Sequence, residues 1–190
     1  MSSLQGALAG VRVLDLSRLL PGPYASLILA DLGAQVDKVE EPGVGDYLRH
    51  MPPQHAGRGG MFEALNRNKR SITLDLKHPE GRGALLAMVP HYDVLLEQFR
   101  PGVLGRLGLG HEVLRAANPR LIVCALTGYG QEGPMSSRAG HDVNYLAHSG
   151  LLGMQGPAAG APQLPGFQVA DIAGGMWSAL GILAALAARA

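Results

Sequence analysis

Short runs rich in Val, Ile and Leu recur along this chain, with helical stretches or long loops between them, and this alternation restricts the fold most. The five runs are residues 11–16, 35–39, 71–74, 93–96 and 121–126. Strands that alternate with helices imply a mostly parallel sheet covered on both faces. We therefore predict an α/β fold with an open, mostly parallel, Rossmann-like sheet and helices on both faces.

The segments between the runs predict the helices and the loops. Residues 24–32 are long enough for about two helical turns, and residues 79–89 begin with proline and glutamate, which suit a first helical turn. Pro21-Gly22-Pro23 is interpreted as a turn that reverses the chain into the first helix. Two stretches rich in Gly and Pro, residues 42–60 and 150–166, are predicted to be long loops.

Composition excludes several classes of function. A chain of 190 residues that is 47% hydrophobic can bury a core as one domain. Its 16 basic and 15 acidic residues leave a formal charge of +1, which argues against nucleic-acid binding. The single cysteine, Cys124, excludes a disulfide within the chain and a cysteine-based zinc site, and the histidines lack metal-ligand spacing. We expect no metal centre.

The two ends of the sequence bear on location. Residues 1–10 have no basic segment ahead of an apolar one, so we expect a cytoplasmic protein without a secretory signal. Residues 172–188 are uncharged and close to the lower limit for a membrane-spanning helix, but we interpret them as a buried helix of the domain and expect no membrane partner. This helical pattern meets no cap, which indicates a piece of a longer protein.

His141 and Asp171 are the candidate catalytic residues. His141 lies in Ala139-Gly140-His141-Asp142-Val143-Asn144-Tyr145, and Asp171 follows Val169-Ala170. An imidazole and a carboxylate that converge on one pocket can move a proton between them. The alternatives are a histidine that caps a helix or lies in the core, and an aspartate that is the N-cap of the final helix. As N-cap, Asp171 would lie beside the first amides of that helix and the substrate carbonyl.

Two further motifs indicate a binding site. Arg67, Asn68, Lys69 and Arg70 precede a strand, and Arg100 follows another beside a Pro-Gly turn. These groups are either solvated surface or a clamp for phosphate, which suits the fork of arginine. Gly128-Tyr129-Gly130-Gln131-Glu132-Gly133 fits G-x-G-x-x-G but follows the fifth strand and runs into Pro134, so we predict a pocket-lining turn and no dinucleotide site.

Several segments together resemble family III CoA-transferases, the CaiB/BaiF family. They are residues 8–16, Pro21-Gly22-Pro23, Ala30-Asp31-Leu32-Gly33-Ala34 with Val36 and Val39-Glu40, residues 66–71, 74–77 and 99–103, and Thr127-Gly128-Tyr129-Gly130. The resemblance implies that residues 1–190 are the CoA-binding large α/β domain. It also implies that a small domain and a C-terminal return of the chain are absent here.

The motif Gly140-His141-Asp142-Val143-Asn144-Tyr145 resembles the α-methylacyl-CoA racemase branch. That branch implies an acyl-CoA substrate, with His141 and Asp171 as two bases that remove and return the α-proton of a 2-methylacyl-CoA. Transferases keep the aspartate as nucleophile and usually lack the histidine, so CoA transfer through an Asp171 mixed anhydride stays open. A third alternative is a non-catalytic acyl-CoA-binding half.

The resemblance further implies the ligand contacts and the assembly. Coenzyme A enters as part of the substrate, with no tightly bound cofactor. The residues expected to hold it are Arg67, Asn68, Lys69, Arg70, Leu74, Asp75, Arg100 and Tyr145. We expect a homodimer in the full-length context, where a glutamate beyond these residues supports His141. We expect the 190 residues alone to self-associate without racemase activity.

Overall fold

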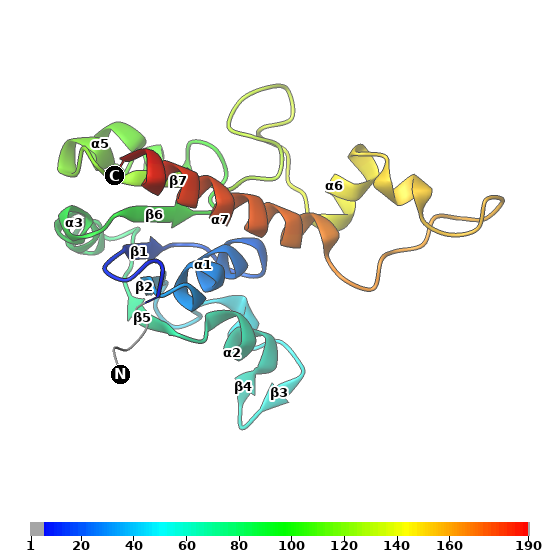
Figure 1. Cartoon of the computed structure of the whole chain (residues 1–190), viewed down its shortest axis with the longest axis horizontal. Helices are drawn as coiled ribbons and strands as arrows, with labels where there is room; N and C mark the ends of the chain where they lie inside the picture. Colours follow the sequence, from blue (N-terminus) through cyan, green and yellow to red (C-terminus); the bar gives the residue numbers. More distant parts are fainter. Residues whose placement is uncertain (1–5, 190) are drawn as a thin grey trace.

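The computed structural model describes residues 6–189, and their centre is a five-stranded sheet (Figure 1). The strands, in sheet order, are β5 (Lys69–Thr73), β2 (Gln35–Glu40), β1 (Arg12–Asp15), β6 (Val94–Glu97) and β7 (Ile122–Ala125). All four pairings are parallel, and Val13 of β1 lies opposite Val36 and Val94. The predicted open parallel sheet is confirmed.

Helices cover both faces of the sheet, as expected. The helices on one face are α1 (Pro21–Asp31) and α7 (Val169–Arg189), and those on the other are α3 (Pro79–Met88), α4 (Val103–Arg106) and α5 (His111–Ala117). Successive residues of β1 show the division, because Val13 packs with α1 and α7, whereas Leu14 packs with α3 and α5. Both side chains are fully buried. Such alternate burial is what a two-sided parallel sheet requires.

The Pro-Gly-Pro segment is not a turn before the first helix, because α1 begins at Pro21. A proline in the first helical turn loses no hydrogen bond, since those amides have no partner within the helix. β5 also begins earlier than the sequence predicts, so that Lys69 and Arg70 lie within the strand. This strand is at the edge of the sheet, where polar residues with carboxylate partners replace an apolar run.

The two predicted long loops differ from each other. Residues 42–60 contain regular structure, namely η1 (Tyr47–Arg49) and the hairpin of β3 (Gln54–His55) and β4 (Arg58–Gly59), and they lead into α2 (Gly60–Asn66). Leu48 and Leu65 of this region pack against Leu27 of α1 in a small third core. Residues 150–166 contain only η3 (Leu151–Met154) and, with α6 (Asp142–His148), extend away from the sheet (Figure 1).

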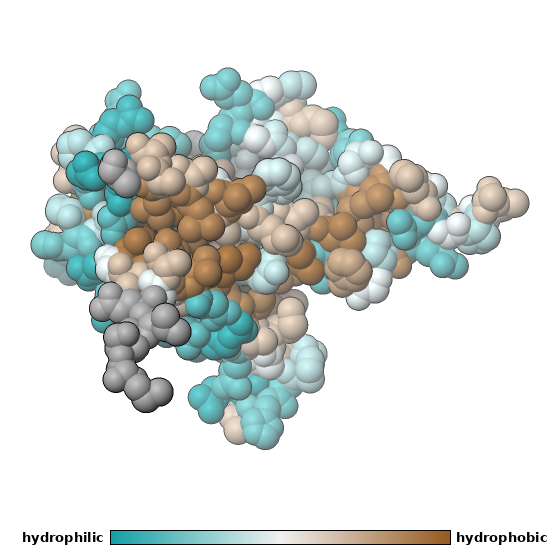
Figure 2. Space-filling view, viewed as in Figure 1, coloured by the Kyte–Doolittle hydropathy of each residue, from teal (hydrophilic) through white to brown (hydrophobic). Residues whose placement is uncertain are grey.

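α7 is confirmed as a helix, but it is not buried on all sides. Gly175 lies against the Pro21 carbonyl oxygen, where a Cβ would come within 2.6 Å, so its lack of a side chain lets α7 approach α1. Met176, Trp177 and Leu180 are 54%, 72% and 53% exposed. Apolar residues gather along α1 and α7 on the face in Figure 2. α7 is also long and apolar enough to cross a membrane, by length and composition alone, so the expected absence of a membrane partner stays a prediction.

Glu97, at the end of β6, makes stability depend on pH. Its buried carboxylate accepts a hydrogen bond from Phe99 N (2.7 Å), and burial raises its pKa from 4.5 to about 7. The folded state therefore holds a proton that the unfolded state has released between these pH values, and stability falls as pH rises through this window.

We expect Glu97→Gln, which keeps an oxygen acceptor and removes the charge, to unfold with a free energy roughly 1–3 kcal/mol above that of the wild type at pH 8. This advantage should shrink at pH 4.5, the ordinary pKa of the group. Urea denaturation at both pH values measures it, and an advantage independent of pH would contradict the assignment of the raised pKa to Glu97.

Candidate functional site

Two adjoining cavities lie at the carboxyl ends of the strands, where parallel sheets place their ligands. In the strand order, β1 lies between β2 and β6, and the chain changes direction across the sheet between β1 and β6. The first cavity has a volume of about 620 Å³ and the second about 410 Å³. Both are lined by Gln98, Phe99 and Arg100, which follow β6, so they form one continuous candidate site.

A buried network of charges positions the loop that follows β1. The Lys38 ammonium lies 3.0 Å from the Asp46 carboxylate and donates to the Ser17 carbonyl oxygen at 2.6 Å. The Asp15 carboxylate accepts from Ser17 N at 2.9 Å and lies 3.5 Å from Lys69 Nζ. Buried charges need such partners. The network therefore fixes the loop that lines both cavities.

The first cavity has three basic side chains, namely Arg18, Lys77 and Arg100. Arg18 and Lys77 reach Glu41 only at 4.0 Å and 3.9 Å, and both are exposed. Arg100 has no ion pair among residues 6–189. Basic groups without close carboxylates are available to an anion, and phosphate is the anion that such groups bind best.

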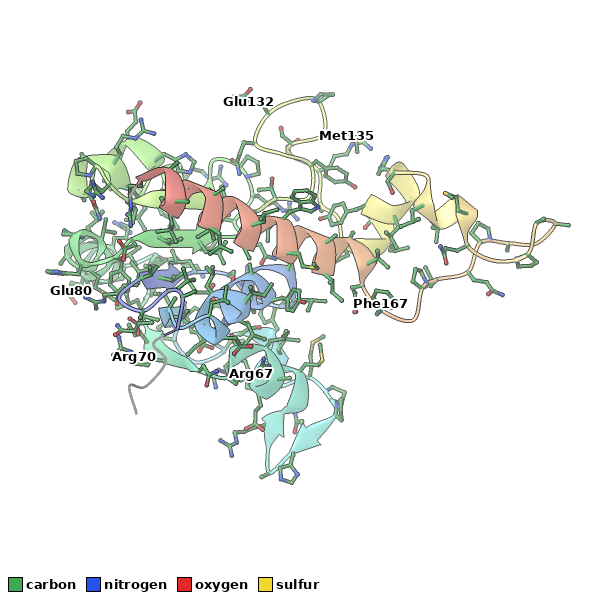
Figure 3. All side chains as sticks on the ribbon, viewed as in Figure 1. Arg67, Arg70, Glu80, Glu132, Met135 and Phe167 are labelled. Carbon is green, nitrogen blue, oxygen red and sulfur yellow. The ribbon has the colours of Figure 1, made fainter. Side chains whose placement is uncertain are left out.

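The predicted CoA contacts do not all meet at this site. Leu74, Asp75 and Arg100 line the first cavity. Arg67 and Asn68 instead bond to Asp31 at the end of α1, and Arg70 makes a two-pronged ion pair with Asp37, at 2.6 Å and 2.7 Å. Figure 3 shows Arg67 and Arg70 on the opposite side of the view from Glu132 and Met135.

The reason is the position of these residues along the chain, because Arg67 and Asn68 directly precede β5 and Arg70 is its second residue. They lie at its amino end, whereas the cavities lie at the carboxyl ends of the strands. Lys69 is buried, bonds to Asn66 and the Pro23 carbonyl oxygen, and pairs with Asp15. Burial lowers its pKa to about 8, although Asp15 opposes this shift. The structure thus places Lys69 in the network that supports the loop after β1.

His141 and Asp171, the candidate catalytic residues, line the second cavity together. His141 directly precedes α6, and its backbone N–H donates to Asn144 Oδ1 at 2.9 Å. Asp171 is the third residue of α7, which begins at Val169, so the prediction that it is the N-cap is wrong. The Asp142 carboxylate instead accepts from Ala170 N and Asp171 N, at 2.7 Å and 3.0 Å. These first amides of α7 are therefore already occupied.

The environment of Asp171 favours proton transfer near neutral pH. Burial, together with the neighbouring Asp142 carboxylate, raises its pKa from 3.8 to about 6, while His141 opposes the shift. A carboxyl group with such a pKa exists in both protonation states near neutral pH. Perturbed carboxyl groups beside a histidine in a cavity are typical of sites of acid–base chemistry.

Tyr145 and Gly128, the first residue of the glycine-rich turn, line the second cavity. The Tyr145 hydroxyl donates to the Gly140 carbonyl oxygen at 2.7 Å. Its ring lies so close to Gly128 that a Cβ there would come within 2.1 Å of the hydroxyl oxygen. No helix follows Gly133 until α6, and Gly128 is the residue of this motif that lines the second cavity, so the predicted pocket-lining turn is confirmed at Gly128.

Several residues of the site were not named individually from the sequence as ligand contacts, among them Arg18, Gln98, Phe99 and Arg138. Gln98 Oε1 accepts a hydrogen bond from Gly22 N at 3.1 Å and so joins the end of β6 to the start of α1. The position of Arg18 and Gln98 after strand ends was the available signal, and Lys77 was named only within such a segment. Among residues 6–189, no three His, Cys, Asp or Glu side chains are grouped to hold a metal ion.

Comparisons with known proteins agree on one family. The model of CoA-transferase family III matches residues 8–190. Human succinyl-CoA:glutarate CoA-transferase is 43% identical over 180 residues, which are 94% of this chain and 41% of that protein. Human alpha-methylacyl-CoA racemase is 45% identical over 182 residues, which are 95% of this chain and 44% of that protein. The chain thus spans less than half the length of these relatives.

Solved structures share the fold. A CaiB/BaiF family protein from Brucella suis superposes with a TM-score of 0.93 and 40% identity, over 97% of this chain and 50% of that chain. A hypothetical protein from Mycobacterium tuberculosis superposes with a TM-score of 0.90 and 41% identity, over 97% of this chain and 51% of that chain. The large α/β architecture inferred from the sequence is therefore the one found in these proteins.

Arg100 and Arg67 provide a matched test of the phosphate contacts. We expect Arg100→Ala to weaken CoA binding roughly 10-fold or more, because a hydrogen bond to a charged group contributes about 1.5–3 kcal/mol. Binding by the variant should also depend less on salt. Arg67→Ala, which breaks the ion pair with Asp31, should change the affinity much less. Calorimetry at two salt concentrations decides, and equal losses in both variants would place Arg67 in the site as well.

Proposed function

Because the chain belongs to CoA-transferase family III, a family of enzymes, we propose that it forms the site of an acyl-CoA racemase or epimerase. The proposed reaction removes and returns the proton on the carbon next to the thioester carbonyl of a 2-methylacyl-CoA. The observation that supports it is the presence of His141 and Asp171 in the wall of one cavity. Two bases on opposite sides of the α-carbon are what inversion of that centre requires.

The proposed chemistry uses no group outside the protein and the substrate. One base takes the α-proton, and the electron pair of the C–H bond moves into an enolate whose negative charge lies on the thioester oxygen. The conjugate acid of the other base then protonates the carbon from the opposite face, which inverts the centre. The enolate oxygen needs hydrogen-bond donors. With the first amides of α7 occupied by Asp142, the turn at Gly128 is the candidate donor segment.

The two cavities accommodate the two parts of an acyl-CoA. We place the thioester in the second cavity beside His141 and Asp171, and the phosphates of CoA in the first, near Arg18, Lys77 and Arg100. Gln98, Phe99 and Arg100 line the junction, where the pantetheine arm would pass. In this arrangement coenzyme A is part of the substrate, and Tyr145, in the second cavity, contacts the acyl end of that substrate.

CoA transfer is the second candidate, favoured by the names of several relatives, including the human succinyl-CoA:glutarate CoA-transferase. In this reaction the Asp171 carboxylate attacks the thioester carbonyl, a mixed anhydride forms, and CoA leaves as the thiolate. The thiolate next attacks the Asp171 carbonyl of this anhydride, which releases the first carboxylate and leaves a thioester on Asp171. A second carboxylate attacks that thioester and frees the thiolate again, and the thiolate takes the new acyl group from the second anhydride and restores the Asp171 carboxylate. His141 has no required role in this route.

The proposal extends to the whole protein. We propose that residues 1–190 are the CoA-binding large domain of a cytoplasmic homodimeric enzyme whose small domain lies outside this sequence. A glutamate from outside this sequence would then support His141. A chain that only binds acyl-CoA remains the non-catalytic alternative, and the exchange experiment below separates it from the two enzymes.

Replacement of His141 tests the two-base mechanism. The full-length protein is incubated with one enantiomer of a 2-methylacyl-CoA in deuterated water, and the incorporation of deuterium at the α-carbon is followed by mass spectrometry. We expect His141→Ala to slow deuterium uptake by roughly 10²-fold or more, the usual contribution of a general base. CoA binding should stay within a few-fold of the wild type, because His141 lies outside the phosphate-binding cavity.

His111→Ala is the control, since His111 is an exposed residue at the start of α5 outside both cavities. Full deuterium uptake by His141→Ala would remove the racemase proposal. If His141→Ala keeps full deuterium uptake and a new acyl-CoA forms when a dicarboxylate is added, CoA transfer would be favoured. Binding of acyl-CoA without exchange or transfer in the wild type would support the non-catalytic alternative.

The pKa of Asp171 predicts how the exchange rate depends on pH. In the direction in which Asp171 removes the proton, its carboxylate must be ionised, so the rate should fall as pH falls through about 6. Initial rates from pH 4.5 to 8 with each enantiomer measure this limb. A rate that stays level down to pH 4.5, as it would for the ordinary aspartate pKa of 3.8, would show that burial and Asp142 do not control the reacting group.

A further inference from the structure

Asp142, between the two candidate bases, links the helices that hold them. It is the first residue of α6 and directly follows His141. Its Oδ1 accepts from Ala170 N at 2.7 Å and from Asp171 N at 3.0 Å, across 28 and 29 residues of sequence. The side chain next to one base thus binds the backbone of the other.

These two amides have no acceptor within their own helix. The first helical hydrogen bond of α7 runs from Ile172 N to the Gln168 carbonyl oxygen, at 3.0 Å. The amides of the first turn precede it and need partners from elsewhere. A carboxylate suits this place, because the positive end of the helix dipole lies there.

The path of the chain between α6 and α7 leaves their relative position to contacts between the two helices. Residues 149–168 contain only the short η3 and extend away from the sheet before returning to Val169 (Figure 1). An irregular excursion of that length does not by itself hold its two ends in register. The packing of α6 on α7 and the Asp142 hydrogen bonds are the contacts that do so.

We propose that Asp142 is a positioning residue for the reaction. Its carboxylate holds the first turn of α7 against the start of α6 and so keeps His141 and Asp171 on either side of one cavity. The inference rests on the two-base function proposed above. It adds a residue that touches neither substrate nor reacting atom and acts through both bases.

The charge of Asp142 has a second effect that its hydrogen bonds do not have. The groups that face Asp171 are the Asp142 carboxylate and the His141 imidazole from the start of α6, and Tyr145 from its next turn. Arg100 and Arg138 lie in the wall of the same cavity. Because Asp142 is the negative neighbour in this set, neutralising it should lower the pKa of Asp171.

Two variants separate the hydrogen bonds from the charge. Asp142→Asn keeps an oxygen acceptor for the two amides but removes the charge, whereas Asp142→Ala removes both. Glu132→Gln is the matched control, because Glu132 is an exposed carboxylate between β7 and α6 whose own side chain lines neither cavity. The first readouts are hydrogen exchange of the Ala170 and Asp171 amides and the NMR titration of the Asp171 carboxyl carbon, neither of which needs turnover.

We expect Asp142→Ala to speed exchange of both amides roughly 10-fold or more, since their acceptor is lost, and Asp142→Asn to leave them protected. The Asp171 titration should move below about 6 in both variants, and not in Glu132→Gln. In the α-deuterium assay, kcat should fall roughly 10- to 100-fold in Asp142→Ala with a smaller change in KM, because misplaced reacting groups lose rate. Asp142→Asn should lose less of its kcat than Asp142→Ala, and the acid limb of its rate should lie at lower pH than that of the wild type.

The outcomes distinguish this inference from the proposed function. Unchanged amide exchange in Asp142→Ala, or a wild-type kcat in that variant, would overturn the role of Asp142. A wild type that exchanges no α-proton, while the amides respond as expected, would overturn the two-base function. The role of Asp142 in joining α6 to α7 would still stand. Equal effects of Asp142→Asn and Glu132→Gln on the acid limb would refute the part of the argument that rests on charge.

Discussion

Two buried lysine ammonium groups position the loop after β1, which lines both cavities. Lys38 pairs with Asp46, and Lys69 pairs with Asp15. Because an unpaired buried charge costs several kcal/mol, the loop after β1 must take the path that supplies these partners. Leu19 accepts a left-handed backbone, with φ of 64°, on that path. The shape of the site thus follows from electrostatics beneath it.

The basic side chains and the candidate acid–base pair lie at the same end of the sheet, the carboxyl ends of the strands. The basic side chains of the first cavity follow β1, β5 and β6, and the half-buried Asp171 lies with His141 in the second. The residues after β6 line both, so a ligand can place a charged end in one and a reacting end in the other. The topology brings these groups together, because the carboxyl ends of β1 and β6 meet where the strand order reverses.

Much of the fold was predictable because it depends on local pattern. Buried parallel strands such as β1 and β6 require apolar runs on both faces, and these runs are visible in the sequence. β5 was placed less well, because an edge strand can begin with Lys69 and Arg70 when Asp15 and Asp37 compensate them. α7 was found as a helix, but the exposure of Trp177 depends on what packs around it.

For the site, the sequence by itself determined the residue types of a candidate acid–base pair, His141 and Asp171, and the place of Arg100 beside a Pro-Gly turn after a strand. The tertiary structure alone decided which charges face the cavities. It directs Arg67 and Arg70 to carboxylates at the amino end of β5 and leaves Arg100 free of ion pairs among the described residues. It also assigns the first amides of α7 to Asp142. Such pairings join residues far apart in the chain, so no local pattern records them.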